Sequence, residues 1–329
     1  MNKKLAILIV GLTCVVSFKS YAVDIVKVDG SSTVFPITEA VAEEFQKTSG
    51  GIKVMVGISG TGGGFKRFCR GETDVSDASR PIKQKEVDAC REGGVEFIEI
   101  PVAFDGLAVL VNKQNTWVDH LTVNELRKIW DSDAQGVVTK WSQVRAGFPD
   151  EEIQLFGPGT DSGTFDYFTE AVNGKAGKSR GDYTASEDDN VLVEGVASAK
   201  GSLGYFGLAY YEQNQDKLKL VPIDDEKNSN GSGPVSPSKE TVIQGQYEPL
   251  SRPLFIYVSM QAAHKESIKK FVKYYLDHAD ALAEEVGYIA LPDEAYQAAQ
   301  ARFNGGTKGS VFSKAHPGLS ITELIRMEK

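Results

Sequence analysis

The sequence predicts an α/β protein built from two lobes. Three times, a short alternating strand pattern is followed by a loop of Gly, Ser and Thr and then by a helical pattern, the unit from which open α/β sheets are built. A chain of 329 residues is also longer than one core usually supports. Two extended apolar segments, far apart in the sequence, can carry the chain between lobes. We therefore expect a discontinuous first lobe, 23–103 plus 255–329, and an inserted second lobe, 104–254.

The three units are predicted from the same pattern of alternation, small polar residues and helical apolar spacing. The predicted strand, loop and helix are 24–30, 31–33 and 37–45 in the first unit, 52–57, 59–64 and 65–69 in the second, and 153–156, 157–163 and 164–171 in the third.

The segments 101–112 and 253–259 are the two extended stretches that we expect to cross between the lobes. Between them, Thr122 and Glu125 form a capping box, which predicts the start of a helix. The remaining predictions are a surface loop over 228–237, a helix over 267–277 and a last helix from Ile321 that returns to the first lobe.

Residues 1–22 are expected to be a cleaved secretory signal peptide rather than part of the fold. Two lysines precede the apolar run Leu5–Val16, and Ser20 and Ala22 stand at the −3 and −1 positions of a cleavage site. The run is shorter than the roughly 18 to 20 residues of a membrane span. Cys14 lies inside the run, a context that fits lipid attachment poorly. We therefore expect a periplasmic protein.

The charge balance excludes nucleic acid as an expected partner. The chain has 36 Lys and Arg against 45 Asp and Glu, a net charge of −9, and losing the three lysines of the signal peptide makes the mature chain more acidic still. Phosphate backbones are bound through a surplus of basic residues, which this chain lacks. A small anion is not excluded, because backbone N–H groups, hydroxyls and one or two arginines can hold it.

Two cysteines remain in the mature chain, Cys69 and Cys90. In an oxidising compartment such a pair predicts one disulfide. Two separate buried thiols are the alternative.

The three loops share a chemistry that suits an anion. Gly, Ser and Thr let the backbone approach a ligand closely, and the helix that follows presents unpaired N–H groups and a partial positive charge. The alternative for any one loop is that its Ser or Thr simply caps the helix. Three such loops on two lobes favour one shared ligand.

Enzymatic alternatives are weaker. The stretch 60–66 departs from the nucleotide P-loop pattern, because Phe65 stands at the second Gly position and Arg67 follows the lysine. Ser162 lacks the G-x-S-x-G context of a hydrolase nucleophile, and none of the four histidines stands in a recognisable triad setting. No His, Cys and Asp spacing suggests a metal site. A secreted serine hydrolase or phosphatase is kept as an alternative from another class.

The motifs themselves resemble the PstS-type phosphate-binding proteins of ABC importers. They occur in order along essentially the whole mature chain: Asp29–Pro36, Gly57–Lys66, Asp77–Pro81, Leu121–Trp130, Thr160–Thr164, Tyr183–Leu192 and Leu203–Gly207. The resemblance implies a type II periplasmic-binding-protein fold, two α/β lobes joined by a two-segment hinge with the ligand cleft between them. It also implies a binding protein that is not an enzyme, works without a cofactor or metal and hands inorganic phosphate to a membrane permease. We expect a monomer.

Carried over from the family residue by residue, the phosphate site is a set of hydroxyls and backbone amides with one arginine. It comprises Ser32, Thr33, Val34, Ser59, Thr61, Gly62, Ser79, Arg80, Ser162, Gly163 and Thr164. Such neutral donors can bind a dianion without a matching formal charge.

Two positions depart from the family pattern. Arg80 stands where the best-known members have the Asp that accepts the phosphate proton, and Pro158 stands where they have an Arg. Our hypothesis is that Arg80, together with Arg180, supplies the guanidinium for phosphate. Asp77 or Asp161 would then hold that arginine or accept the ligand proton. Because the usual Asp is absent, a receptor for sulfate, molybdate or tungstate stays open as the alternative.

Overall fold

The computed structural model describes residues 24–227, 233–313 and 321–328. The predicted signal peptide, with Cys14, and half of the predicted surface loop 228–237 lie outside the described residues. Within the described part, no helix is both long and apolar enough to cross a bilayer.

Eleven strands and thirteen α-helices are found in the described residues. The strands are β1 Ile25–Gly30, β2 Lys53–Ile58, β3 Val75–Ala78, β4 Phe97–Asn112, β5 Leu121–Thr122, β6 Gln154–Pro158, β7 Thr184–Ser186, β8 Ser202–Gly207, β9 Leu218–Leu220, β10 Ile223–Asp224 and β11 Ser251–Ser259.

The helices cover the sheet. They are α1 Phe35–Thr48, α2 Gly60–Phe68, α3 Gln84–Glu92, α4 Val123–Trp130, α5 Trp141–Val144, α6 Gly163–Asn173, α7 Asp189–Ser198, α8 Leu208–Glu212, α9 Lys239–Ile243, α10 Met260–Ala263, α11 Glu266–Glu285, α12 Asp293–Asn304 and α13 Ile321–Glu328, with one 3₁₀ turn at Ser132–Ala134.

One sheet runs through the molecule in the order β2-β1-β3-β11-β4-β8-β6-β7, with β9 also paired to β4. At one end β1 is parallel to β2 and β3, and at the other β6 is parallel to β7 and β8. Between them, β11 pairs antiparallel along its whole length with the first part of β4, Phe97–Gly106, and both strands are buried throughout. Both ends therefore have the parallel strand order that places loops at the carboxyl edge of a sheet.

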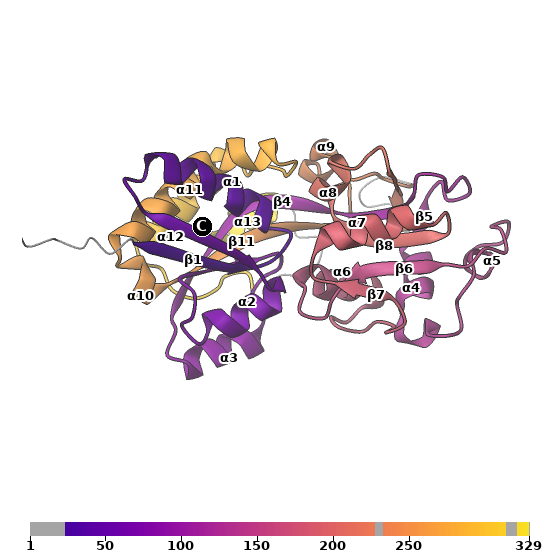
Figure 1. The fold of residues 1–329 in the computed structure, drawn as a ribbon, viewed down its shortest axis with the longest axis horizontal. Coiled ribbons are helices and arrows are strands. Elements are labelled where there is room, and N and C mark those ends of the chain that lie inside the picture. The colour runs from indigo at the N-terminus through magenta and orange to yellow at the C-terminus, as the bar shows by residue number, and fades with distance from the viewer. Residues whose placement is uncertain (1–23, 228–232, 314–320, 329) are drawn as a thin grey trace, which may run out of the picture.

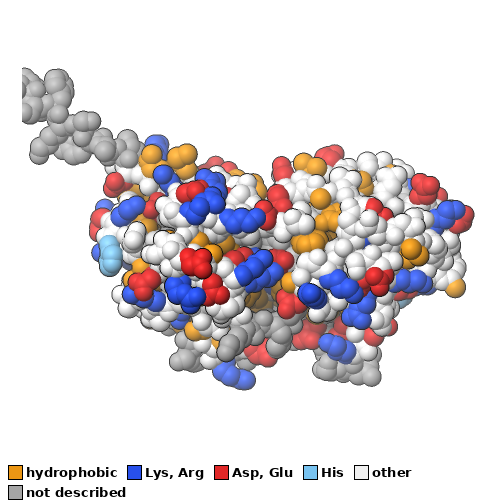
Figure 2. Space-filling view, turned by 90° about the horizontal axis from the view of Figure 1, so that it is seen from below, with side chains coloured by type: hydrophobic (Ala, Val, Ile, Leu, Met, Phe, Trp, Pro, Cys, Tyr) orange, Lys and Arg blue, Asp and Glu red, His pale blue; other side chains and the backbone are white. Residues whose placement is uncertain are grey.

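Figure 1 shows the elements in two groups. The first group contains β1 to β3, α1 to α3 and α10 to α13, and the second contains β5 to β8 and α4 to α9, with the long strands β4 and β11 between them. Figure 2 shows the same two masses in a space-filling view, with basic and acidic side chains mixed over that face. The predicted lobe boundaries at residues 103/104 and 254/255 fall inside β4 and β11, and they stay a prediction.

Most predicted elements lie within two or three residues of the observed ones, and the helices generally extend further. The capping box is confirmed, since Thr122 Oγ1 accepts the Glu125 N–H at 3.1 Å and Glu125 Oε2 accepts the Thr122 N–H at 2.9 Å. The disulfide is also confirmed: Cys69 at the end of α2 is bonded to Cys90 in α3.

Residues 60–64 of the glycine-rich stretch 59–64 are helical, with Ser59 as the N-cap residue, so the prediction of a loop there was wrong. The helix α2 begins at Gly60 rather than at Phe65. Its glycines serve close packing: a Cβ atom on Gly64 would lie 2.6 Å from the Cα atom of Gly30 in β1. Only glycine allows this close approach of the helix to β1. Tertiary packing therefore outweighs the low helix propensity of the glycines in this segment.

Candidate functional site

The loops that follow the parallel strands meet between the two groups of elements. The chain leaves β1 at Gly30, β2 at Ile58 and β3 at Ala78 in the first group, and β6 at Pro158 in the second. Carboxyl ends of parallel strands lie on one edge of a sheet, so the loops beyond them converge. Each of three loops leads into the first turn of α1, α2 or α6, where N–H groups have no partner within the helix itself.

Hydroxyl groups contact each other in the interior, both between and within the two groups of elements. Thr33 Oγ1 of the first group lies 3.0 Å from Thr164 Oγ1 of the second. Within the first group, Thr61 Oγ1 lies 3.2 Å from Ser79 Oγ. All four residues are buried. We call Ser32, Thr33, Thr61, Ser79, Ser162, Gly163 and Thr164 the hydroxyl cluster.

Gly163 places the first turn of α6 directly against the first group. A Cβ atom on Gly163 would lie 2.4 Å from Thr61 Oγ1 and 2.5 Å from Ser79 Oγ. Any larger residue would therefore separate the hydroxyls of the two groups. Ser162, the residue before it, caps α6 by accepting the Thr164 N–H at 3.1 Å.

A fully buried arginine from β11 completes this cluster. Arg252 Nη2 donates to Thr164 Oγ1 at 2.9 Å and to Thr33 Oγ1 at 3.3 Å. Its Nε and Nη2 also donate to Asp105 Oδ2. Its Nη1 is buried and has no hydrogen-bond partner among the described residues. A buried guanidinium nitrogen without an acceptor is costly, so this donor is suited to an anion.

Asp189 is the second buried acid at the cluster. It lies at the start of α7, and Ser32 Oγ donates to its Oδ2 at 3.5 Å, a long contact. Burial raises the pKa of Asp189 to about 7, and the nearby Arg252 charge opposes that shift. Tyr210, from the same group of elements, donates its hydroxyl to the Ser32 carbonyl at 3.1 Å.

Several predicted site residues use their polar groups elsewhere. Ser59 donates its hydroxyl to Asp29 at 2.7 Å, and the Gly62 N–H donates to the Asp161 carbonyl at 2.7 Å. The Val34 N–H reaches the Ser31 hydroxyl at 3.4 Å. These contacts hold the loops in place. In this arrangement the Ser59 hydroxyl and the Gly62 and Val34 N–H groups are therefore not free to bind a ligand.

The structure does not bring the guanidinium groups of Arg80 and Arg180 into the hydroxyl cluster. The Arg80 guanidinium donates to Glu86, Asp166 and the Pro81 carbonyl. Arg180 lies among α4, the turn after it and its own loop, where it donates to Asp182 and to two backbone carbonyls. In this arrangement our hypothesis that these two arginines hold the anion is not supported, because acids and carbonyls already take their donors.

The carboxylates of the predicted acids, Asp161 and Asp77, make no hydrogen bond to a residue of the cluster in the described part of the chain. Asp161 forms an exposed ion pair with Lys66. Asp77 is buried and its carboxylate oxygens have no hydrogen-bond partner among the described residues. Burial raises the pKa of Asp77 to about 8, and the Thr38 hydroxyl, in α1, opposes the shift. Neither acid holds Arg80, which Glu86 and Asp166 hold instead.

Sequence reasoning missed Arg252, Asp105 and Asp189, although a signal was present for the first two. Each stands at or inside a strongly apolar extended segment, 253–259 or 101–112. A charged side chain within a buried strand must form an ion pair or bind a ligand, because burying an isolated charge costs a large amount of free energy. Their pairing, across 147 positions, could be read only from the register of β11 and β4.

Comparison with known proteins shows the family to which the chain belongs. Residues 19–278 match the model of a PBP superfamily domain. Protein SphX of Synechococcus elongatus is 54% identical over 92% of this chain and 89% of that protein. Phosphate-binding protein PstS of Staphylococcus saprophyticus is 39% identical over 85% of this chain and 84% of that protein.

Solved structures are similar along the chain as well. A possible phosphate binding protein from Planctomyces limnophilus has 49% identity and a TM-score of 0.63, covering 87% of this chain and all of that one. An ABC-type phosphate transport receptor from Vibrio cholerae has 23% identity and a TM-score of 0.61, covering 81% of this chain and all of that one. At this identity the similarity shows the fold alone. The predicted type II periplasmic-binding fold is thereby confirmed. The chain belongs to the PBP superfamily, in the family that includes SphX and the phosphate-binding protein PstS.

Proposed function

We propose that this protein is an extracytoplasmic receptor that binds inorganic phosphate and delivers it to the membrane permease of an ABC importer. The named functions of its relatives support this, since the PstS relatives are named phosphate-binding proteins and the Planctomyces structure is described as a possible phosphate binding protein. The proposal does not rest on names alone, because the buried cluster has the donors that a phosphate dianion needs.

The observation that carries the proposal is the unpartnered Nη1 of Arg252 beside the hydroxyls of Thr33 and Thr164. A guanidinium N–H forms a strong, charge-assisted hydrogen bond with an oxygen of a tetrahedral anion. Around it, hydroxyls and first-turn amides from both groups of elements can donate to the remaining oxygens. In our proposal phosphate enters between these groups and replaces their direct hydroxyl contacts.

Charge balance at the cluster also suits phosphate. Asp105 already neutralises Arg252, so the anion is held mainly by hydrogen bonds to neutral donors. Asp189 adds a possible acceptor. Phosphate near neutral pH keeps a proton that a carboxylate can accept, whereas sulfate has none and is repelled by it. We propose Asp189, rather than Asp77 or Asp161, as the group that favours phosphate.

The wider arrangement follows from the same proposal. We propose the first lobe as 23–103 plus 255–329 and the second as 104–254, with β4 and β11 as the two hinge segments. Phosphate, by contacting both lobes, would stabilise their closed arrangement. Cleavage of a signal peptide over 1–22 and release into the periplasm complete the proposal, supported by the N-terminal sequence pattern.

A hydrolase or phosphatase has little support. Ser162 uses its hydroxyl to cap α6, and within the described residues no hydrogen bond joins it to a histidine. A serine nucleophile needs such a base within hydrogen-bond reach. The family is one of binding proteins, and this chain is not an enzyme.

The test is a titration of purified, phosphate-stripped protein with phosphate, sulfate, molybdate and tungstate by calorimetry. We expect phosphate to bind at least a hundredfold more tightly than sulfate. Arg252→Lys should weaken phosphate binding at least tenfold, because a single ammonium group cannot keep the contacts to Asp105 and the two threonines and also donate to the anion. Arg145→Lys, in an ion pair with Glu125 outside the cluster, is the matched control. Sulfate binding as tight as phosphate binding would overturn the proposal.

A further inference from the structure

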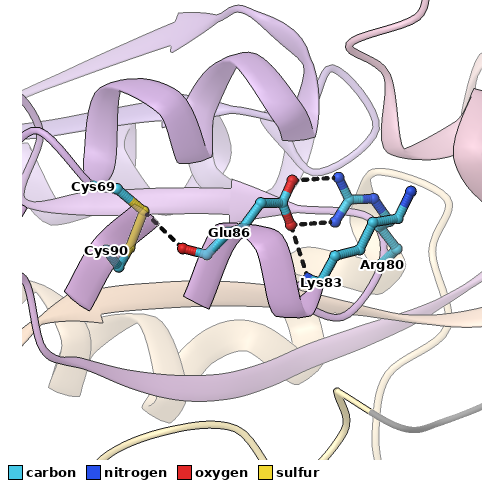
Figure 3. The surroundings of a disulfide bond; sticks show 5 residues. All are labelled: Cys69, Arg80, Lys83, Glu86 and Cys90. Carbon is cyan, nitrogen blue, oxygen red and sulfur yellow. Dashed lines mark hydrogen bonds and ion pairs between the residues drawn. A yellow bond between two sulfur atoms is a disulfide. The ribbon is translucent and has the colours of Figure 1, made fainter. Parts of the chain in front are cut away.

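Arg80 is held by acids on two sides. Its Nη1 and Nη2 donate to the two carboxylate oxygens of Glu86 at 2.8 and 2.7 Å, and its Nε donates to Asp166 Oδ2 at 2.8 Å. Figure 3 shows the fork between Arg80 and Glu86, together with Lys83 and the nearby disulfide. Only 4% of Arg80 is exposed, so these contacts are protected from water.

Asp166 belongs to the opposite group of elements. It lies in the first turn of α6, and its N–H donates to the Ser162 carbonyl at 3.2 Å. Besides Arg80 it contacts Lys83, whose Nζ lies 2.7 Å from the same Oδ2. Two cations of the first group therefore hold the turn that carries Ser162, Gly163 and Thr164.

The charges within this set already balance. Two basic side chains, Arg80 and Lys83, face two acidic ones, Glu86 and Asp166. An anion bound by Arg80 would have to compete with both carboxylates in a place of low dielectric. This argues against Arg80 as a ligand and leaves its contact with α6 to be explained.

We propose that Arg80 is a positioning residue: braced by Glu86, it acts through Asp166 to fix the first turn of α6 against the hydroxyls of Thr61 and Ser79. The inference rests on the proposed function, because the anion that this turn helps to bind is taken to be phosphate. Arg80 thus contributes to affinity without contacting the ligand.

The disulfide connects the Arg80, Glu86 and Asp166 contacts to α2, which carries Thr61 of the hydroxyl cluster. It joins Cys69, at the end of α2, to Cys90 of α3, and the Cys69 sulfur lies 3.5 Å from the Glu86 carbonyl oxygen. The helix α2 carries Thr61 in its first turn, and α3 carries Glu86. One connected scaffold therefore joins Thr61 to the α6 turn through α2, the disulfide, α3, Glu86, Arg80 and Asp166.

The first experiment is a double-mutant cycle on phosphate binding with Arg80→Gln, Asp166→Asn and the two combined. If Arg80 acts through Asp166, each single variant weakens binding about tenfold and the combination weakens it little further. A ligand role predicts additive losses, about a hundredfold for the combination, and that result would overturn the inference. If the unmodified protein prefers another oxyanion, the cycle is measured with that anion, so the two proposals fail separately.

The second experiment needs no ligand. Hydrogen exchange of the peptide covering 162–168 is measured in phosphate-free protein, and Arg80→Gln should speed it at least tenfold because the turn loses its anchor. Unchanged exchange together with weakened phosphate binding would show that Arg80 contacts the anion itself. Lys66→Gln is the matched control: its ion pair with Asp161 also joins the two groups but is exposed, so both readouts should change less than threefold.

Discussion

Arg252 and Asp105 face each other directly across the antiparallel pair of β11 and β4. Arg252 Nη2 lies 3.0 Å from Asp105 Oδ2, Nε lies 3.2 Å from the same oxygen, and neither side chain has any exposed surface. The Leu208 N–H donates to the other carboxylate oxygen at 3.3 Å. The pair thus fixes a guanidinium at the hydroxyl cluster, where its remaining donor has no partner among the described residues.

Removing one member of this pair should destabilise the protein strongly. Asp105→Ala leaves Arg252 buried without its counterion, which costs on the order of 3 to 5 kcal/mol. The free energy of unfolding, measured by urea denaturation, should fall by that amount. The double variant Asp105→Leu with Arg252→Met should regain most of it, since both charges are gone, while phosphate binding stays lost. Equal stability of Asp105→Ala and the unmodified protein would contradict the prediction.

Asp189 should control selectivity between phosphate and sulfate. Asp189→Asn replaces a carboxylate with a neutral amide, so the repulsion of sulfate disappears and the preference for phosphate should narrow at least tenfold. Because burial raises the pKa of Asp189 to about 7, the unmodified protein should also discriminate less at pH 6 than at pH 8. Calorimetric titration with both anions at the two pH values measures this. A preference that is the same in both proteins would exclude Asp189 from this role.

Asp77 should make stability depend on pH. Burial raises its folded-state pKa from 3.8 to about 8, so folding favours the protonated form. This contribution is present below the unfolded-state pKa and is lost as pH rises toward 8, by about 1.4 kcal/mol per pH unit.

Asp77→Asn, which cannot ionise, should therefore gain stability relative to the unmodified protein as pH rises from 5 to 8. Urea denaturation at each pH gives the difference. Asp133→Asn, an exposed acid in the second group of elements, should show no such trend. A constant difference between Asp77→Asn and the unmodified protein would mean that Asp77 is ionised in the folded state.

The disulfide should stabilise the protein independently of phosphate. It closes a loop with a sequence separation of 21, for which chain entropy predicts about 3 kcal/mol. The Cys69→Ser, Cys90→Ser double variant should unfold at lower urea concentration by that free energy, and reducing agent should affect only the unmodified protein. If both proteins respond equally to reductant, the bond does not form in solution.

Much of the fold could be predicted from the sequence because its signals are local. Alternation, helical spacing and the capping box of Thr122 and Glu125 depend on neighbours within a few residues, and the structure has those elements. The first turn of α2, over 60–64, is the exception. Its helical conformation depends on the approach of Gly64 to β1, a contact between distant segments.

In the candidate site, too, some features could be predicted from the sequence and others depend on the tertiary structure. By itself, the sequence determined the family, the hydroxyl-bearing loops with Ser32, Thr33 and Thr164, and a pair of cysteines. Only the tertiary structure decided that Arg252, rather than Arg80, donates to those hydroxyls through Nη2 and keeps a buried Nη1 without a partner among the described residues. The reason is physical: the partners of a buried charge are chosen by strand register and by packing between the two groups of elements. Such choices depend on residues more than a hundred positions apart, which no local pattern encodes.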